Sequence, residues 1–277
     1  MLGKLLKHEF KQTAKAYAPS YLALTAVIVF TVIFSYFTTI SSSNEFNTGN
    51  LPDIILAMLM IATFIGIFAI IFGTVILEIA RFSKNLMDVE GYFMFSLPVS
   101  AASHIAAKLI VATAWAIISI AFSLIAVPIL MMGISRIPAY ELSVAIKTLL
   151  PLITPEIVLA VISVIFATIM GIVFCYSLAY MAISVGPHVT KNRIVGSLIV
   201  FFGSEMALNV ASTALMGFAG SFALKNVNFN SLIASLNANP TAAITITMLS
   251  TLVYSITVSA LCLTVCNYFL SKKLNLS

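Results

Sequence analysis

The sequence predicts an all-α, polytopic membrane protein with six transmembrane helices, and two observations carry this prediction. Of the 277 residues, 61% are hydrophobic and only 8% are charged, whereas a soluble domain carries about 25% charged residues. Six apolar runs are also long enough for a helix to cross the hydrocarbon layer, which takes about 20 residues. A soluble enzyme, a disordered protein and a disulfide-stapled secreted domain are therefore excluded. Because the runs are continuously apolar, a β-barrel is excluded as well.

The six predicted spans form a single transmembrane domain over residues 1–277. They cover residues 17–40, 54–77, 109–132, 157–184, 194–218 and 243–270. The connection at 133–156 mixes charged and apolar residues, which indicates a short helix at the outer surface. The extracellular connection at 219–242 contains five Asn residues around Leu232 and Ile233, which suits a loop with a short re-entrant helix.

The positions of the Lys and Arg residues predict the orientation. Eleven of the fourteen lie on the side that holds both termini, and the other side has only Arg136, Lys147 and Lys225. This positive-inside bias predicts cytoplasmic termini and a multi-pass protein of the cell membrane. Although the net charge is +5, the basic residues are too few and too dispersed for a nucleic-acid interface.

The segment before the first span is amphipathic. One stripe comprises Leu2, Leu5, Leu6, Phe10, Thr13, Ala14 and Tyr17, and the opposite face carries Lys4, Lys7, His8, Lys11 and Lys15. This pattern predicts an interfacial elbow helix over residues 1–16, with its apolar face in the lipid and its lysines toward anionic headgroups. The alternative is a plain basic segment that only sets the topology.

The connection at 78–108, predicted to be cytoplasmic, is the most informative part of the sequence. It reads EIARFSKNLMDVEGYFMFSLPVSAASHIAAK and combines charged residues with aromatic ones. The second span is predicted to continue as a helix through Arg81 and Lys84. Gly91 then permits a sharp reversal, and Pro98 ends any helix before it. The result is a charged and aromatic projection into the cytoplasm.

Here the sequence resembles the permease subunits of ABC-2-type exporters of Gram-positive bacteria. The resemblance is carried by Arg81-Phe-Ser-Lys-Asn-Leu, by Glu90-Gly-Tyr and by Ser96-Leu-Pro-Val-Ser, followed by Lys108 at the opening of the third span. The six-span layout and the basic N-terminal helix are also similar to that family. The compact layout is similar to that of exporters of phenol-soluble-modulin peptides.

The resemblance implies that this loop is a coupling helix seated in a cleft of a separate ATP-binding subunit. Asp88 and Glu90 would meet basic groups there, and Tyr92 and Phe93 would anchor the contact. The residues implied in coupling are Arg81, Lys84, Asp88, Glu90, Gly91, Tyr92, Phe93, Leu97 and Pro98. ATP and Mg would be bound by the partner subunit, and a second permease copy or homologue would complete a dimer. The alternative is a loop whose aromatic residues only lie on the headgroups.

Several kinds of chemistry are missing from the sequence. It has no G-x-x-x-x-G-K-[ST] loop, so we expect no ATPase activity of its own. His8, His104 and His188 lie in three separate segments, and we expect no metal site. Cys175, Cys262 and Cys266 are interpreted as buried packing residues and not as a redox pair.

One charge is predicted at membrane depth. Glu205 lies near the middle of the fifth span and shares a helical face with Asn209 and Ser212. Because an ionised carboxylate is costly at the bilayer centre, this polar face is predicted either to line a translocation path or to contact a neighbouring helix. A protonated carboxyl is a further alternative. Small residues on another face, Gly203, Ala207, Ala211 and Ala214, suit close packing within the bundle or between protomers.

These features favour the transmembrane subunit of an ATP-driven exporter. Short external loops favour export of a substrate from the membrane or the cytoplasm, with amphipathic peptides first and lipids or hydrophobic drugs next. The alternative is a stand-alone secondary transporter or channel, which is expected to show paired intramembrane acids and bases. An intramembrane enzyme is disfavoured because no catalytic cluster lies at membrane depth.

Overall fold

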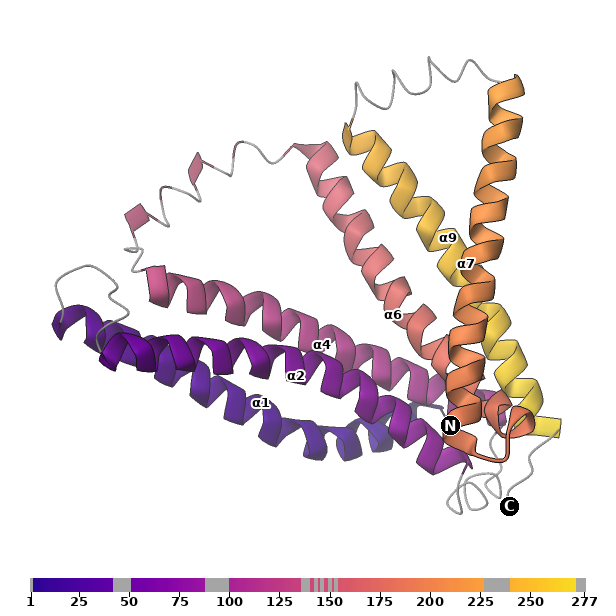
Figure 1. Cartoon of the computed structure of the whole chain (residues 1–277), viewed down its shortest axis with the longest axis horizontal. Helices are drawn as coiled ribbons and strands as arrows, with labels where there is room; N and C mark the ends of the chain where they lie inside the picture. The colour runs from indigo at the N-terminus through magenta and orange to yellow at the C-terminus, as the bar shows by residue number, and fades with distance from the viewer. Residues whose placement is uncertain are drawn as a thin grey trace. The chain divides into compact units, whose positions relative to one another are not determined.

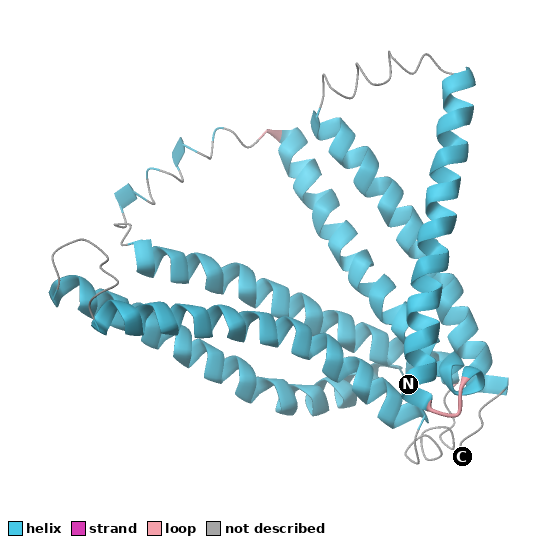
Figure 2. Ribbon diagram, in the orientation of Figure 1, coloured by secondary structure: helices cyan, strands magenta, loops and turns pink. Residues whose placement is uncertain are grey.

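The structure, a computed structural model, describes most of the chain. The described residues are 2–41, 51–87, 100–135, 140, 141, 144, 147, 148, 151, 154–226 and 240–272. Nearly all of them are helical, and none is in a strand (Figure 2). The predicted cytoplasmic residues 88–99 lie outside the described residues, and so do residues 227–239, the middle of the connection predicted at 219–242, with the predicted re-entrant helix.

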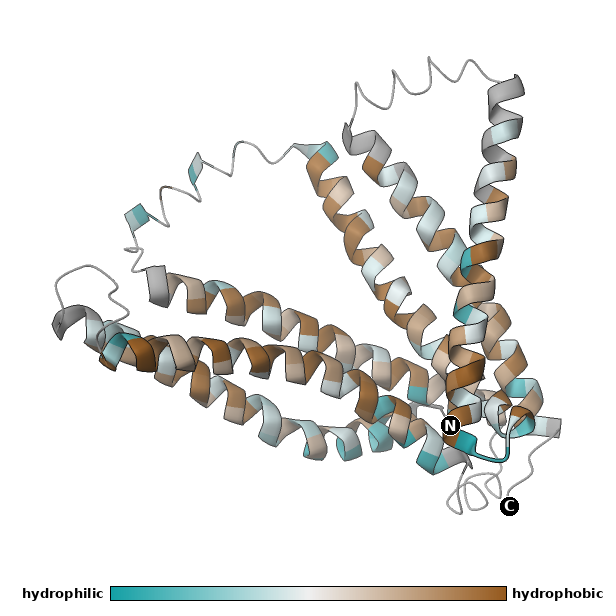
Figure 3. Cartoon of the chain, viewed as in Figure 1, coloured by the Kyte–Doolittle hydropathy of each residue, from teal (hydrophilic) through white to brown (hydrophobic). Residues whose placement is uncertain are grey.

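Six long helices account for most of the described residues (Figure 1). They are α1 (Leu2–Ser41), α2 (Leu51–Met87), α4 (Ala101–Ser135), α6 (Pro155–Val189), α7 (Arg193–Asn226) and α9 (Pro240–Lys272). All six are long and apolar enough to cross a membrane, which confirms the predicted number of spans. Hydrophobic residues extend over most of each helix (Figure 3).

The helices are longer than the predicted spans. α2 has 37 residues, which corresponds to about 55 Å at 1.5 Å per residue against a hydrocarbon layer of about 30 Å. Its helical structure continues through Arg81 and Lys84, as predicted. α7 runs on to Asn226, eight residues beyond the predicted end of the fifth span. In the connection at 133–156, the described positions 140, 141, 144, 147 and 148 are helical.

The amphipathic segment and the first span form one helix. α1 is continuous from Leu2 to Ser41 and contains Pro19. Proline removes one backbone hydrogen bond from a helix, yet the helix continues through this position. The interfacial orientation of residues 1–16 stays a prediction.

The contacts divide the chain into two compact units. The first comprises Met1–Glu78 and Ile110–Leu152, and the second comprises Ile79–Leu109 and Ile153–Ser277. α2 and α4 therefore each contribute residues to both units. In the first unit α1, α2 and α4 lie side by side (Figure 1). In the second unit α6 packs against both α7 and α9.

One buried stripe follows α1 through the first unit. Its fully buried members recur at steps of three, four or seven residues and are Glu9, Thr13, Tyr17, Leu24, Ile28, Thr31, Ser35 and Thr38. Leu24 and Ile28 pack with Ile67 of α2 and Leu130 of α4 in an apolar cluster. This spacing is the pattern by which one helix face packs against others. α1 is thus held along its length by protein contacts.

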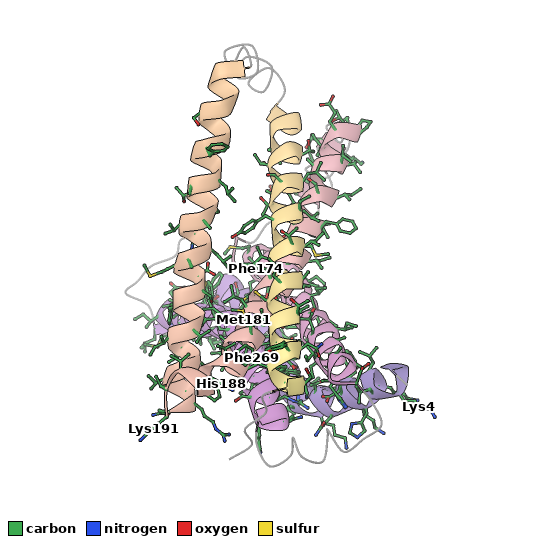
Figure 4. All side chains as sticks on the ribbon, turned by 90° about the vertical axis from the view of Figure 1, so that its right-hand side faces the viewer. Lys4, Phe174, Met181, His188, Lys191 and Phe269 are labelled. Atoms are coloured by element: carbon green, nitrogen blue, oxygen red, sulfur yellow. The ribbon has the colours of Figure 1, made fainter. Side chains whose placement is uncertain are left out.

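The core of the second unit lies between α6 and α9. α6 buries nearly every residue from Tyr176 to Gly186, and α9 buries a stripe that includes Val258, Cys262, Cys266 and Leu270. α6 begins at Pro155 after Thr154, whose hydroxyl accepts a hydrogen bond from the backbone N–H of Ile157 (3.4 Å). This arrangement is a standard N-cap. Figure 4 shows Phe174, Met181 and His188 along α6, with Phe269 of α9 beside His188.

Candidate functional site

The predicted coupling residues divide into two groups. Arg81, which is half-buried, and Lys84, which is exposed, lie in the last turns of α2. The other seven, Asp88, Glu90, Gly91, Tyr92, Phe93, Leu97 and Pro98, lie outside the described residues. The structure describes the helix ends on either side of these seven residues, the end of α2 and the start of α4.

The end of α2 is anchored in the second unit by an aromatic stack. The rings of Phe82 and Tyr180 are parallel within 7°, with their centroids 3.7 Å apart. Both side chains are 0% exposed. Tyr180 packs in turn near Tyr176, at a centroid distance of 6.2 Å, and its carbonyl accepts a hydrogen bond from the Cys266 thiol of α9. Phe82 therefore connects the start of the loop to the α6–α9 core.

The start of α4 anchors the other side of the loop. α4 begins at Ala101, and the Ser100 carbonyl accepts hydrogen bonds from the backbone N–H groups of Ser103 (2.9 Å) and His104 (3.3 Å). His104, Ile105, Ala107 and Lys108 are then buried. The predicted third span opens at Lys108, and α4 begins about two turns before that residue. Hydropathy marked the apolar run but not the polar first turns, which are buried in protein.

The polar face of α7 is confirmed by direct contacts. The Asn209 amide donates a hydrogen bond to the Glu205 backbone carbonyl (3.0 Å) and one to its carboxylate Oε1 (3.4 Å). The Ser212 hydroxyl donates to the Asn209 carbonyl (2.9 Å). Glu205 is half-buried and Asn209 is exposed.

Glu205 also has neighbours on the two other helices of the second unit. Its carboxylate lies within electrostatic range of the Cys175 thiol on α6 and of the Tyr254 hydroxyl on α9. Tyr254 in turn lies against Phe174 of α6, with ring centroids 6.3 Å apart.

The small residues of α7 do not pack within the described part of this chain. Gly203, Ala207, Ala211 and Ala214 are all exposed, and a Cβ added at Gly203 would meet nothing within 4 Å. Of the two predicted alternatives, packing within the bundle finds no support among the described residues, and packing between protomers stays a prediction. α6 and α7 approach each other closely where α6 ends and α7 begins. There a Cβ on Gly186 would come within 2.5 Å of the Ser197 backbone nitrogen, and one on Gly196 would contact the Gly186 carbonyl.

Sequence reasoning missed a buried polar cluster in the first unit. The Tyr17 hydroxyl of α1 donates to the Glu78 carboxylate of α2 (3.0 Å), and the Trp115 indole of α4 donates to the Thr13 hydroxyl of α1 (2.7 Å). Trp115 also stacks on Phe10, with centroids 5.0 Å apart and planes at 15°. The spacing of Glu9, Thr13 and Tyr17 along α1 is the signal that could have revealed it.

A second row of hydroxyls continues this cluster. Ser119 of α4 shares hydrogen bonds with Tyr21 of α1 (2.6 Å) and with Thr74 of α2 (2.9 Å). Further along the same unit, Thr31 and Thr63 are 3.3 Å apart. Each hydroxyl is satisfied by a neighbouring helix or by its own helix, as burial requires. The three helices of the first unit are thus joined by polar contacts at several levels.

The cysteines and histidines form no common site in the part of the chain that the structure describes. Cys262 and Cys266 are buried, as predicted, but Cys175 is exposed, which corrects the prediction for that residue; all three are free thiols. His104 is buried, whereas His8 and His188 are exposed. Among the described residues, no group of three His, Cys, Asp or Glu residues could hold a metal ion.

Comparisons with protein families, with curated proteins and with solved structures found no match. The fold itself defines a multi-pass membrane protein with six helices long and apolar enough to cross a membrane.

Proposed function

We propose that this protein is the transmembrane permease subunit of an ABC-2-type, ATP-driven exporter. The observation that carries the proposal is the anchoring of the two helix ends that flank residues 88–99. Phe82, six residues before this segment, is stacked on Tyr180 of α6, and His104 and Ile105, just after it, are buried in the same unit. Helix ends that are packed in this way can pass a displacement applied between them on to the helices.

The two helices that flank this segment, α2 and α4, each contribute residues to both compact units. In the proposal, a displacement of the segment therefore acts on both units. The loop sequence supplies Asp88, Glu90, Tyr92 and Phe93 for contact with a separate ATP-binding subunit, which would hold ATP and Mg. In this proposal the chain is the subunit whose helices move, and the separate subunit hydrolyses ATP.

The polar face of α7 supports a path for an amphipathic cargo. Glu205, Asn209 and Ser212 give one side of the helix polar groups, while Met206 and Val210 beside them are exposed and apolar. A peptide with one apolar and one polar face can place its polar face on these polar groups and its apolar face on the neighbouring apolar side chains. Amphipathic peptides are therefore the proposed substrate class, ahead of lipids and hydrophobic drugs.

A second copy of the permease or a homologue completes the proposed transporter. The exposed stripe of Gly203, Ala207, Ala211 and Ala214 supports this part of the proposal, because small residues let two helices approach closely within lipid.

The decisive experiment is affinity purification of the tagged full-length protein from its native membrane. We expect a separate ATP-binding subunit to co-purify, and its ATPase activity to rise when an amphipathic peptide is added. Changing Glu90→Gln and Tyr92→Ala together is expected to reduce the co-purified ATPase at least tenfold.

The chain offers a matched control for this double change. Glu141 and Tyr140 form an exposed pair, with the Tyr140 hydroxyl 3.1 Å from the Glu141 carboxylate, on the side predicted to face outward. Glu141→Gln with Tyr140→Ala is expected to leave the ATPase bound. Absence of any ATPase from the wild-type preparation, with substrate flux retained in vesicles of purified protein, would instead favour a stand-alone transporter or channel.

A further inference from the structure

A groove in the first unit lies between the start of α1 and the start of the predicted third span on α4. Its lining includes Phe10 of α1 and Ile110, Val111 and Ala114 of α4, and its volume is about 610 Å³. Phe10 is fixed as one wall because its ring stacks on Trp115. This volume lies within the range of sites that bind small molecules.

Two lysines are the charged residues that line this groove. Lys7 and Lys11 both contribute to the lining and both are exposed. They are four residues apart on one helix, so they lie on the same face and repel each other unless an anion lies near them. Almost all of the lining surface is apolar, so the two lysines line the groove with their methylene chains and add two positive charges beside it.

The position of the groove along α4 indicates its depth. Ile110, Val111 and Ala114 belong to the first turns of the predicted third span, directly after Lys108. The sequence therefore predicts that they lie near the point at which the chain enters the hydrocarbon layer. The distribution of Lys and Arg predicts that this is the cytoplasmic boundary, and the cytoplasmic leaflet is rich in anionic lipids.

We propose that the groove is a binding site for one anionic phospholipid of that leaflet. The phosphate would lie between Lys7 and Lys11, and the upper part of an acyl chain would lie on Ile110 and Ala114 beside Phe10. A soluble anion can pair only with the lysines, whereas a phospholipid can also cover the apolar lining with its acyl chain. The proposal is independent of any transport function.

Native mass spectrometry of the purified full chain in detergent tests the site. Phosphatidylglycerol is expected to bind at least tenfold more tightly than phosphatidylcholine. Lys7→Gln with Lys11→Gln is expected to weaken phosphatidylglycerol binding about tenfold to thirtyfold, as loss of two lysines near an anionic headgroup implies. Ile110→Gln, which changes an exposed side chain and leaves both lysines in place, is expected to weaken it severalfold.

The control removes the same charge on other segments of the chain. Lys147 and Lys191 are also exposed, and Lys147→Gln with Lys191→Gln is expected to keep binding within about twofold of the wild type, since exposed charges beyond a Debye length are largely screened. An equal loss in this control, unchanged binding in the Lys7 and Lys11 variant, or equal binding of glycerol 3-phosphate without its acyl chains would each overturn the proposal. The melting temperature of every variant verifies that the fold is retained.

Discussion

The Tyr17 hydroxyl of α1 donates a hydrogen bond to the Glu78 carboxylate of α2 over 3.0 Å, and both side chains are at least 95% buried. This contact joins the N-terminal part of the chain to α2 at a point three residues before Arg81, the first of the predicted coupling residues. A buried carboxylate depends on such donors, because burial without them is costly.

Replacing Tyr17 with Phe removes this donor and leaves the ring in place. We expect the free energy of unfolding in detergent to fall by about 1.5–3 kcal/mol, the usual contribution of a hydrogen bond to a charged group. Tyr36→Phe is the control, since Tyr36 lies on the same helix and is 67% exposed. An equal loss in both variants would show that the Tyr17–Glu78 contact is not what stabilises the first unit.

The approach of α6 and α7 leads to a second prediction. A Cβ at Gly186 would lie 2.5 Å from the Ser197 backbone nitrogen, and backbone atoms cannot give way as a flexible side chain does. We expect Gly186→Ala to lower the melting temperature, at a cost of about 1–3 kcal/mol for overpacking.

Gly203→Ala provides the comparison on α7 itself. Because a Cβ there meets nothing within 4 Å, this change is expected to leave the melting temperature unchanged or to raise it slightly, as replacing a mid-helix glycine does. A ranking in which the Gly203 variant is the less stable of the two contradicts the structure.

The Phe82–Tyr180 stack allows a double-mutant cycle. Phe82→Leu, Tyr180→Leu and the double variant are expected to give a coupling free energy of about 0.5–1.5 kcal/mol, typical of an aromatic pair. The same cycle at Phe68 and Phe72, which are 6.5 Å apart and exposed, is expected to give a smaller coupling. If the proposed exporter is correct, Phe82→Leu also lowers transport more than it lowers ATPase binding, because the loop stays intact while its anchor is weakened.

The charge of Glu205 is tested by Glu205→Gln. The amide keeps an acceptor for Asn209, so the fold is expected to be retained, while transport of the peptide substrate is expected to fall at least tenfold if a charge in the path is required. Glu141→Gln, an exposed acid outside the predicted spans, is the control and is expected to transport normally. Full transport by the Glu205 variant would remove the carboxylate from the proposed path.

The six spans could be predicted from the sequence because each is a long apolar run, and hydropathy reports such runs directly. The start of α4 could not, since its polar first turns are stabilised by burial in protein, as with His104 and Lys108. The pairing of Glu205 with Asn209 followed from a four-residue spacing. The contacts of Thr13, Tyr17 and Trp115 could not be predicted, because hydroxyls within apolar runs give no hydropathy signal and their partners lie far away in the sequence.

The buried stripe of α1 has a consequence for how the protein is made. The hydrogen-bond partner of Thr13 is the indole of Trp115, 102 residues later in the chain. The partner of Tyr21 is Ser119, on the same later helix. During synthesis, α1 is therefore complete before α4 exists to cover its polar side chains. Completion of the first unit is thus a late event in biogenesis, and a nascent chain that stops after α2 leaves uncovered the groups that the finished protein buries.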